Sequence, residues 1–383
     1  MLVVAPTPYF ADRGCHVRIY EEAKALRARG VEVLVVTYPL GRTLAGVPTS
    51  RTIGVPWYRK LEAGPSAHKV YIDGLLLART LQEIRRFRPH VLHAHLHEGA
   101  AIALAARTVT RIPFVFDIQG SLADELAAHG ATSSRGPLYR FARRVERFLY
   151  RASDALVVNS RAAVELLGRE FGIVPDRVIV APDAVAPRSV GPHDAREIRE
   201  RFDLGEGPVI GFLGLMTAYQ GMDLLLDALP RVLEKRPDVR ALLMGFPDAP
   251  YRRRADASGL SSSVRFTGRV PYEDVTRHLA AVSVAVSPKV TSSEGNGKLL
   301  EYMAAALPTV AFDTPVNREI LGEDGVLVKE QNPVALADAL IRALDEPDGR
   351  GERLRRRAAE LFSWDRSVDA LLGAYRDAAA RRR

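Results

Sequence analysis

The sequence predicts two α/β domains, each built around a parallel, doubly wound sheet. Three observations support this prediction. The 383 residues exceed what one ordinary hydrophobic core accommodates. Short apolar strand candidates alternate with helical stretches nearly throughout the chain. The alternation is interrupted once, between Ala181 and Asp194, by a segment that is rich in proline, alanine and glycine and lacks hydrophobic periodicity, which is typical of a linker.

The first half of the chain is predicted to hold six strands. Leu2–Ala5 is the first of them, because a secretory leader would need a basic start and a longer apolar run. The strand candidates are Leu2–Ala5, Val31–Thr37, Val91–Ala94, Pro113–Ile118, Ala155–Asn159 and Arg177–Val180. The predicted helices between them include Val17–Arg29, Val70–Phe87 and Ala100–Val109.

The second half repeats this architecture after the linker. Its strand candidates are Val209–Phe212, Ala241–Met244, Val264–Thr267, Val282–Val286, Thr309–Phe312 and Val326–Val328. Helices are predicted over Met222–Lys235 and Lys298–Ala306. Ligands of doubly wound domains bind beyond the carboxyl ends of the strands, so two facing domains predict a site in a cleft between them.

Composition narrows the class of protein. A hydrophobic fraction of 47% with 26% charged residues is typical of a globular chain, and no apolar run reaches membrane-spanning length. Cys15 is the one cysteine, so no internal disulfide forms and we expect a reducing compartment, the cytoplasm. The net charge of +8 suits nucleic acid, anionic lipid or a phosphate-bearing substrate, but no motif resembles a nucleic-acid module.

Two segments of the first half are candidates for contact with a membrane. Six arginines lie close together with Glu146 as the one acidic residue among them: Arg135, Arg140, Arg143, Arg144, Arg147 and Arg151. They fit either a solvated helix face or a surface for anionic lipid. The long irregular segment 38–65 contains Trp57, Tyr58, Arg59 and Lys60, and loops of this length are uncommon unless they are functional or mobile.

The strongest local feature lies between Ser287 and Ala304. A strand ends, a polar loop with glycines follows, and a helix is expected to begin at Asn296 or Gly297, with asparagine as a favourable N-cap. Free N–H groups at such a helix start bind anions. Lys298 in the first turn opposes the helix dipole, which hints at a bound anion, and Glu301 one turn later suits the hydroxyls of a diol such as ribose.

Three weaker features also follow strands. Gly214 to Gly221 and the turn at Gly14 both join a strand to a helix and allow backbone to approach a ligand. His93, His95 and His97 straddle the end of another strand, and the strand period of two puts His93 and His95 on one face. A zinc site is conceivable there, but no second cluster has metal-ligand spacing, so we favour one cleft-facing histidine and expect no metal.

Several segments together resemble one family. The matching segments are the turn at Gly14 with its helix, Pro89–His95, Gly214–Leu226, Glu294–Ala304 with the strand ending at Asp313, and Phe362-Ser-Trp364 with the final helix. The whole chain resembles retaining glycosyltransferases of the GT-B fold, group 1 or family 4-like. The resemblance implies two Rossmann-like domains facing a cleft: an acceptor-side domain, residues 1–188 completed by helix 364–383, and a donor-binding domain, residues 189–363.

The family resemblance also implies an activity. The chain would move a sugar from a nucleotide-sugar donor to a glycan, lipid-linked or small-molecule acceptor, without a cofactor or a metal, as in the synthesis of cell envelope polysaccharides. The expected catalytic residues are Glu294, which contacts the transferred sugar, His95 and Lys298. The expected donor-binding residues are Glu301, Gly295, Asn296, Gly297, Gly214, Gln220 and Gly14. Asp117 and Gln119 are expected on the acceptor side.

Three departures from the family pattern bear on activity. Leu215 and Gln220 replace the cations that clamp the donor diphosphate, so Lys298, with Lys289 as a second candidate, would substitute. Glu294 and Glu301 are seven positions apart where the family usually has eight, and Gln119 stands where a histidine is frequent. The alternatives are therefore a non-catalytic GT-B binding protein and a nucleotide-sugar epimerase. We expect a cytoplasmic protein with possible peripheral contact at the inner membrane face.

Overall fold

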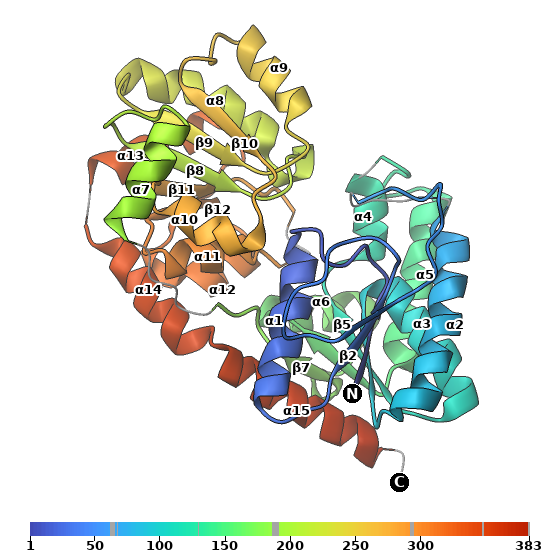
Figure 1. Ribbon diagram of the computed structural model, residues 1–383. Helices are drawn as coiled ribbons and strands as arrows, with labels where there is room; N and C mark the ends of the chain where they lie inside the picture. Colours follow the sequence, from blue (N-terminus) through green and yellow to red (C-terminus); the bar gives the residue numbers. More distant parts are fainter. Residues whose placement is uncertain are drawn as a thin grey trace.

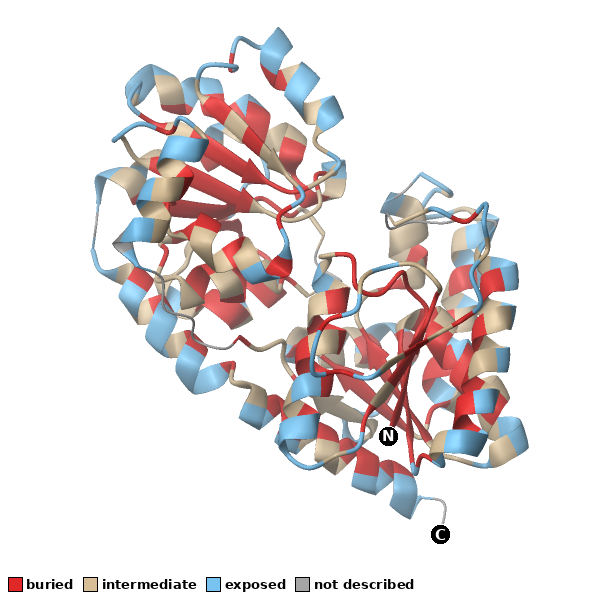
Figure 2. Ribbon diagram, viewed as in Figure 1, coloured by how far each residue is buried: buried red, intermediate tan, exposed pale blue. Residues whose placement is uncertain are grey.

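Two parallel sheets, each with helices on both faces, make up the chain (Figure 1). The computed structural model describes residues 1–61, 66, 68–128, 130–185, 191–291, 295–346 and 348–381. The inner strands of both sheets are almost entirely buried, whereas the helices bury one side and expose the other (Figure 2). The prediction of two doubly wound α/β units is confirmed. In the described residues, no helix combines the length and the apolar character that crossing a membrane requires.

The first sheet has seven parallel strands in the order β3-β2-β1-β4-β5-β6-β7. They are β1 (Leu2–Ala5), β2 (Leu34–Thr37), β3 (Thr49–Arg51), β4 (Leu92–His95), β5 (Phe114–Ile118), β6 (Ala155–Val158) and β7 (Val178–Val180). Strand β3 lies within the segment predicted to be irregular. Its three residues Thr-Ser-Arg lack the apolar run that marks a strand, and its pairing with β2 is what makes it extended.

Alternate residues of β1 contribute to two cores. Leu2 and Val4 pack under the helices on one face, and Val3 and Ala5 pack on the other. The helices after the strands are α1 (Gly14–Ala28), α2 (Lys69–Phe87), α3 (Leu96–Thr110), α4 (Leu122–Ala128), α5 (Pro137–Ala152) and α6 (Arg161–Phe171). Helices α2, α3 and α5 cover the face of Leu2 and Val4, while α1 covers the opposite face.

The second sheet has six parallel strands in the order β10-β9-β8-β11-β12-β13. They are β8 (Val209–Leu213), β9 (Arg240–Met244), β10 (Val264–Gly268), β11 (Val284–Ser287), β12 (Thr309–Phe312) and β13 (Val326–Val328). Its helices are α7 (Pro192–Arg201), α8 (Met222–Lys235), α9 (Ala249–Ala257), α10 (Val275–Leu279), α11 (Lys298–Ala304), α12 (Pro315–Leu321), α13 (Pro333–Asp345) and α14 (Arg350–Leu361).

The last helix, α15 (Trp364–Ala380), returns to the first sheet and lies against α1 (Figure 1). Val368, Leu371 and Ala374 are buried in the same core as Val3. The Tyr375 hydroxyl hydrogen-bonds His93 Nδ1 at 2.5 Å. The expectation that the final helix crosses back rested on the resemblance alone, and this packing agrees with it. The proposed domain boundary falls in 186–190, which lie outside the described residues.

The two units also touch through the loops after β1 and β2 and the segment after β10. Arg42 donates from both terminal nitrogens to the Glu273 carboxylate, each at 2.7 Å. The Tyr272 backbone N–H donates to Asp12 Oδ1 at 2.9 Å, and Arg269 donates to the Ala11 carbonyl at 3.0 Å. These contacts hold the strand ends of one sheet toward those of the other, which leaves a space between them.

Candidate active site

A cavity of about 340 Å³ lies between the carboxyl ends of the two sheets, within the usual size of a small-molecule site. Gly14 and Gln119 line it from the first unit. Gly214 and Lys298 line it from the second unit. The cavity lies beyond the strand ends of both domains, where the sequence predicts the site.

The loop between β11 and α11 is held by Asn296. Its buried side chain donates from Nδ2 to Ser287 Oγ at 3.0 Å and to Asn317 Oδ1 at 2.9 Å. The prediction that Asn296 caps the helix is wrong, because Gly297 occupies the cap position and the asparagine amide is taken up by these two partners. Asn296 instead fixes the loop against α12.

Lys298 and Gln220 meet inside the cavity. The Lys298 ammonium donates to Gln220 Oε1 at 2.7 Å and lies 4.3 Å from the centre of the Phe212 ring. Burial and the neighbouring Lys289 hold the pKa of Lys298 well below its usual range. Among the described residues no carboxylate pairs with this ammonium, so an incoming anion would favour its charged form.

Two glycines shape the wall around Lys298. Gly214 has φ +130°, and a Cβ there would lie 3.0 Å from Lys298 Nζ. Gly221 has φ +77°, and a Cβ there would lie 1.9 Å from the Pro288 carbonyl oxygen. Both positions need glycine, because other residues rarely adopt this backbone and the space is already filled. The tight turn at Gly221 is what directs Gln220 into the cavity.

The remaining predicted donor residues lie near the same wall. Glu301 lines the cavity one helical turn after Lys298. A Cβ on Gly295 would lie 2.0 Å from Asn159 Nδ2, and one on Gly297 would lie 3.6 Å from Asp183 Oδ2. The two glycines therefore let this loop approach the first unit closely. Glu294 lies outside the described residues.

On the first unit's wall, the structure corrects two expectations. Gln119 lines the cavity, but His95 and Asp117 do not and are fully buried behind it. Leu96, with φ +62°, ends the strand, so the histidine that reaches the cavity is His97. Burial lowers the pKa of His97 to about 4. His95 instead accepts a hydrogen bond at Nδ1 from Gln119 Nε2 at 2.8 Å.

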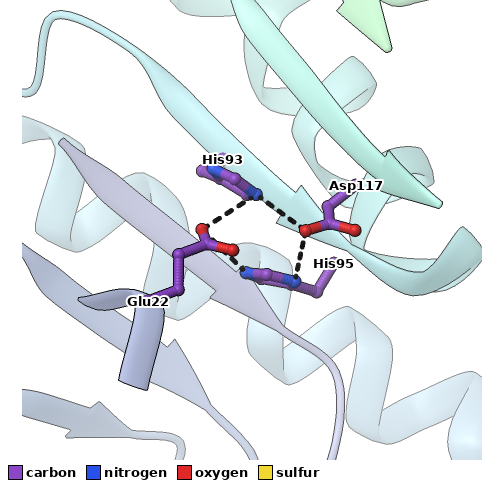
Figure 3. A group of neighbouring side chains, drawn as sticks. All are labelled: Glu22, His93, His95 and Asp117. Carbon is purple, nitrogen blue, oxygen red and sulfur yellow. Dashed lines mark ion pairs between the residues drawn. The ribbon is translucent and has the colours of Figure 1, made fainter. Parts of the chain in front are cut away.

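Behind the wall, Glu22, His93, His95 and Asp117 form a fully buried ring of ionisable side chains (Figure 3). His93 Nε2 lies 3.5 Å from Glu22 Oε1 and 3.6 Å from Asp117 Oδ2. The two imidazoles are stacked, with centroids 4.5 Å apart and planes 20° apart. Stacked rings do not direct their in-plane lone pairs at one ion, so this arrangement favours an ionic network over a metal site.

Arg18 connects this network to the cavity. Its guanidinium donates to Asp117 Oδ2 at 2.9 Å, to Asp183 Oδ1 at 2.8 Å and to the Ala181 carbonyl at 3.0 Å. Burial alone would raise the pKa of Asp117, but Arg18 and the histidines outweigh it and hold that pKa below its usual range. Burial raises the pKa of Glu22 to about 7, against the opposing effect of His93.

Several cavity residues escaped the sequence analysis. They are Arg13, Arg18, Asn159, Asp183 and the ion pair of Lys69 with Glu98. The signals that point to Asn159 and Arg13 are positional: Asn159 directly follows β6, and Arg13 precedes the glycine that starts α1. Arg18, on the second turn of α1, and Asp183, in the linker, have no local signature.

Comparisons with known proteins identify the family. Residues 13–184 match the family description "Glycosyl transferase 4-like domain", and residues 207–346 match "Glycosyl transferases group 1". The chain is 30% identical over 388 residues to a D-inositol 3-phosphate glycosyltransferase of Geodermatophilus obscurus, covering 96% of this chain and 85% of that protein. The chain belongs to this family of glycosyltransferases. This glycosyltransferase is also 27% identical over 356 residues to the phosphatidyl-myo-inositol mannosyltransferase of Mycobacterium leprae, covering 89% and 86% of the two chains.

Solved structures share the GT-B fold of this glycosyltransferase. The sucrose-phosphate synthase of Thermosynechococcus elongatus superposes with a TM-score of 0.82 at 18% identity, covering 99% of both chains. HepE of Anabaena, solved in complex with UDP and glucose, superposes with a TM-score of 0.78 at 17% identity, covering 97% of this chain and 98% of that chain. At these identities the likeness concerns the fold.

Proposed function

We propose that this glycosyltransferase moves a sugar from a nucleotide-sugar donor to a hydroxyl of its acceptor, with retention at the anomeric carbon and without a metal ion. The observation that carries the proposal is the pair Lys298 and Glu301, one turn apart on α11 and both in the cavity. A cation for a diphosphate and a carboxylate for a ribose diol are the two groups that a nucleotide-sugar requires.

In this proposal the Lys298 ammonium binds the donor diphosphate in place of the cations that Leu215 and Gln220 replace. Its ammonium rests on Gln220, where the family usually has a cation, and against Gly214. Gly14 at the start of α1 offers backbone N–H groups to the same diphosphate from the first unit. Gly295, Asn296 and Gly297 shape the loop that holds the donor, and Glu294 contacts the transferred sugar.

The carboxylates of the cavity support the proposal that the donor diphosphate is neutralised without a metal ion. Among the described residues that line it, Asp12 pairs with Arg42, Glu98 with Lys69, and Asp183 with Arg18. A carboxylate held by a basic side chain is a poor ligand for a divalent cation, because the basic charge competes with the ion. The other two carboxylates of the described lining are Glu125 and Glu301. They are far apart in the sequence, unlike the two aspartates of a metal-binding Asp-x-Asp loop.

The configuration at the anomeric carbon is retained because the leaving group departs from, and the acceptor attacks, the same face of the sugar. The leaving diphosphate oxygen departs from the anomeric carbon and accepts the proton of the acceptor hydroxyl, which attacks from the same face. The protein positions both substrates and stabilises the charge on the leaving group. In this scheme Gln119 faces the acceptor, His95 orients Gln119, and Asp117 acts through Arg18.

The acceptor wall favours a phosphate-bearing acceptor. Arg13 and Lys60 line that side of the cavity, and within the described part of the chain the buried Nε atom of Arg13 has no hydrogen-bond partner. Relatives are named for D-inositol 3-phosphate and phosphatidyl-myo-inositol. We therefore propose a phosphorylated polyol, free or lipid-linked, as acceptor, and a cytoplasmic reaction, since one cysteine permits no internal disulfide.

Ligand screening and product analysis test the proposal. Thermal shift with UDP, GDP and ADP, alone and as sugar conjugates, should reveal one stabilising base; a ligand at a hundred times its Kd stabilises by about 2.7 kcal/mol. The stabilising donor is then incubated with D-inositol 3-phosphate, and NMR of the product gives the anomeric configuration. Inversion, or EDTA inhibition that a divalent metal reverses, would contradict the mechanism.

The same assay separates the alternatives. A non-catalytic binding protein would bind the donor and yield neither transfer nor hydrolysis. A nucleotide-sugar epimerase would isomerise the donor without any acceptor.

A further inference from the structure

Helix α5 exposes large apolar side chains. Leu138, Phe141 and Phe148 are exposed by 44%, 60% and 61%. The opposite side of the helix is buried in the core of the first unit through Ala142, Leu149 and other residues. Since full burial of a phenylalanine is worth roughly 1.5–3 kcal/mol, two exposed phenylalanines and a leucine on one helix indicate a surface that contacts something apolar.

Arginines form a second stripe beside the apolar one. Arg140, Arg144 and Arg151 are exposed and are spaced four and seven residues apart, so they share one side of the helix. Phe141 and Phe148 are also seven apart and lie on the adjoining side. We call these two stripes together, Leu138, Phe141, Phe148, Arg140, Arg144 and Arg151, the α5 face.

Packing within the unit accounts for Arg143 and Arg147. Arg143 pairs with Glu146 at 3.2 Å and with Glu170, and its guanidinium lies 3.9 Å from the centre of the Phe171 ring. Arg147 donates to the Glu170 carbonyl. These contacts fasten α5 to α6. They explain why Arg143 is half-buried, but they do not involve the α5 face.

We propose that the α5 face docks on a bilayer that contains anionic lipid. Arginines attract the headgroups and phenylalanines enter the interface, the combination that holds amphipathic helices on membranes. The adjoining α4 lines the cavity with Glu125 and Ala128, so docking sets the acceptor side of the cleft beside the bilayer. The inference goes beyond the proposed function, because docking needs neither donor nor turnover.

The long loop of the first unit contributes less than the sequence suggested. Trp57 is 69% exposed, and its indole donates to the Tyr71 hydroxyl at 3.0 Å. Tyr58 is only 4% exposed, since its ring packs against Tyr38. The expectation that both aromatic residues reach a membrane interface is therefore wrong for Tyr58.

Vesicle co-sedimentation tests the α5 face. The full chain is mixed with vesicles of phosphatidylcholine alone or of phosphatidylcholine with phosphatidylglycerol, at low and high salt. We expect binding to the anionic vesicles alone, weakened by salt. Arg140→Glu with Arg144→Glu should lower the partition coefficient at least tenfold, as should Phe141→Ser with Phe148→Ser.

Matched controls separate the α5 face from general surface effects. Arg253→Glu with Arg356→Glu makes the same charge change at exposed sites of the second unit and should alter binding less than twofold. Val334→Ser is the control for the loss of an exposed apolar side chain.

Equal binding to neutral vesicles, or α5 variants that bind like the wild type, would overturn the proposal. So would a dimer in light scattering that Phe141→Ser with Phe148→Ser dissolves, since a second copy would then cover the face. Donor binding, measured in parallel, reports separately on the proposed function.

Discussion

The Lys298 ammonium lies 2.7 Å from the Gln220 amide oxygen, although the two residues are 78 positions apart in the sequence. Gln220 stands where the family usually has a cation of its own. The cavity therefore has a lysine from α11 at this point, and because burial and Lys289 hold its pKa well below the usual range, a bound anion is what favours its charged form. By the family resemblance, Lys298 would supply a charge for which the family pattern has cations at the positions of Leu215 and Gln220.

Loss of Lys298 should impair the reaction more than loss of Lys289. Lys289 is buried and donates to the Gly295 carbonyl at 2.9 Å, so it supports the loop. Lys298→Ala should lower kcat/KM about a hundredfold, the effect of about 2.7 kcal/mol of lost charge stabilisation. Lys289→Ala should mainly lower the melting temperature. Steady-state kinetics with one donor give kcat/KM for both variants, and thermal unfolding gives their melting temperatures. Equal small losses of turnover in the two variants would assign the stabilisation of the leaving group to another residue.

Donor affinity should fall as pH rises. The free protein holds the pKa of Lys298 well below its usual range, and a bound diphosphate raises that pKa again. Between the two values the lysine must gain a proton for the donor to bind, so affinity is highest at lower pH. Lys298→Arg keeps its charge throughout and should flatten the profile. Calorimetric titration of the donor at several pH values tests this, and parallel profiles for both proteins would contradict it.

Glu301→Gln should weaken donor binding by about 1.5–3 kcal/mol, the range for a hydrogen bond to a charged group. The side chain lines the cavity, so the melting temperature should change little. The same titration with the free nucleoside and with the nucleoside diphosphate locates the loss. An assignment to the ribose requires that both ligands lose affinity, and a loss confined to the diphosphate would move Glu301 to the phosphates.

The buried ring around Glu22 should make stability depend on pH. Burial raises the pKa of Glu22 to about 7, above its value in the unfolded chain, so the folded state loses stability as pH rises from about 4.5 to 7. The pKa of His93 is raised as well, against the effect of burial, by Glu22 and Asp117, and it contributes a loss in the same direction.

Glu22→Gln should reduce this decline by up to about 3 kcal/mol between pH 5 and pH 8, because the pKa of Glu22 is about 7 in the folded state and near 4.5 in the unfolded chain. Thermal unfolding across this range gives the profile, with the exposed Glu165→Gln as the control. Profiles of Glu22→Gln and the wild type that decline in parallel would remove Glu22 as the cause.

Local patterns were sufficient for the fold. Short apolar runs such as Leu2–Ala5 and Val209–Phe212 predict buried parallel strands, because backbone and burial requirements act over a few residues. Strand β3 was not predicted, because its residues lack such a local pattern. Thr49–Arg51 carries no apolar pattern and is extended only because β2 offers an unpaired edge.

The site also has a part that local sequence predicts and a part that depends on tertiary contacts. Lys298, Glu301 and the glycines follow strand ends, and parallel strands bring their carboxyl ends to one edge, so their place in the cavity was predictable. The pairing of Lys298 with Gln220, the link from Arg18 to Asp183 and the choice of His97 over His95 were not. Each depends on a contact between segments far apart in sequence, or on the backbone turn at Leu96, and only packing of the complete chain decides such contacts.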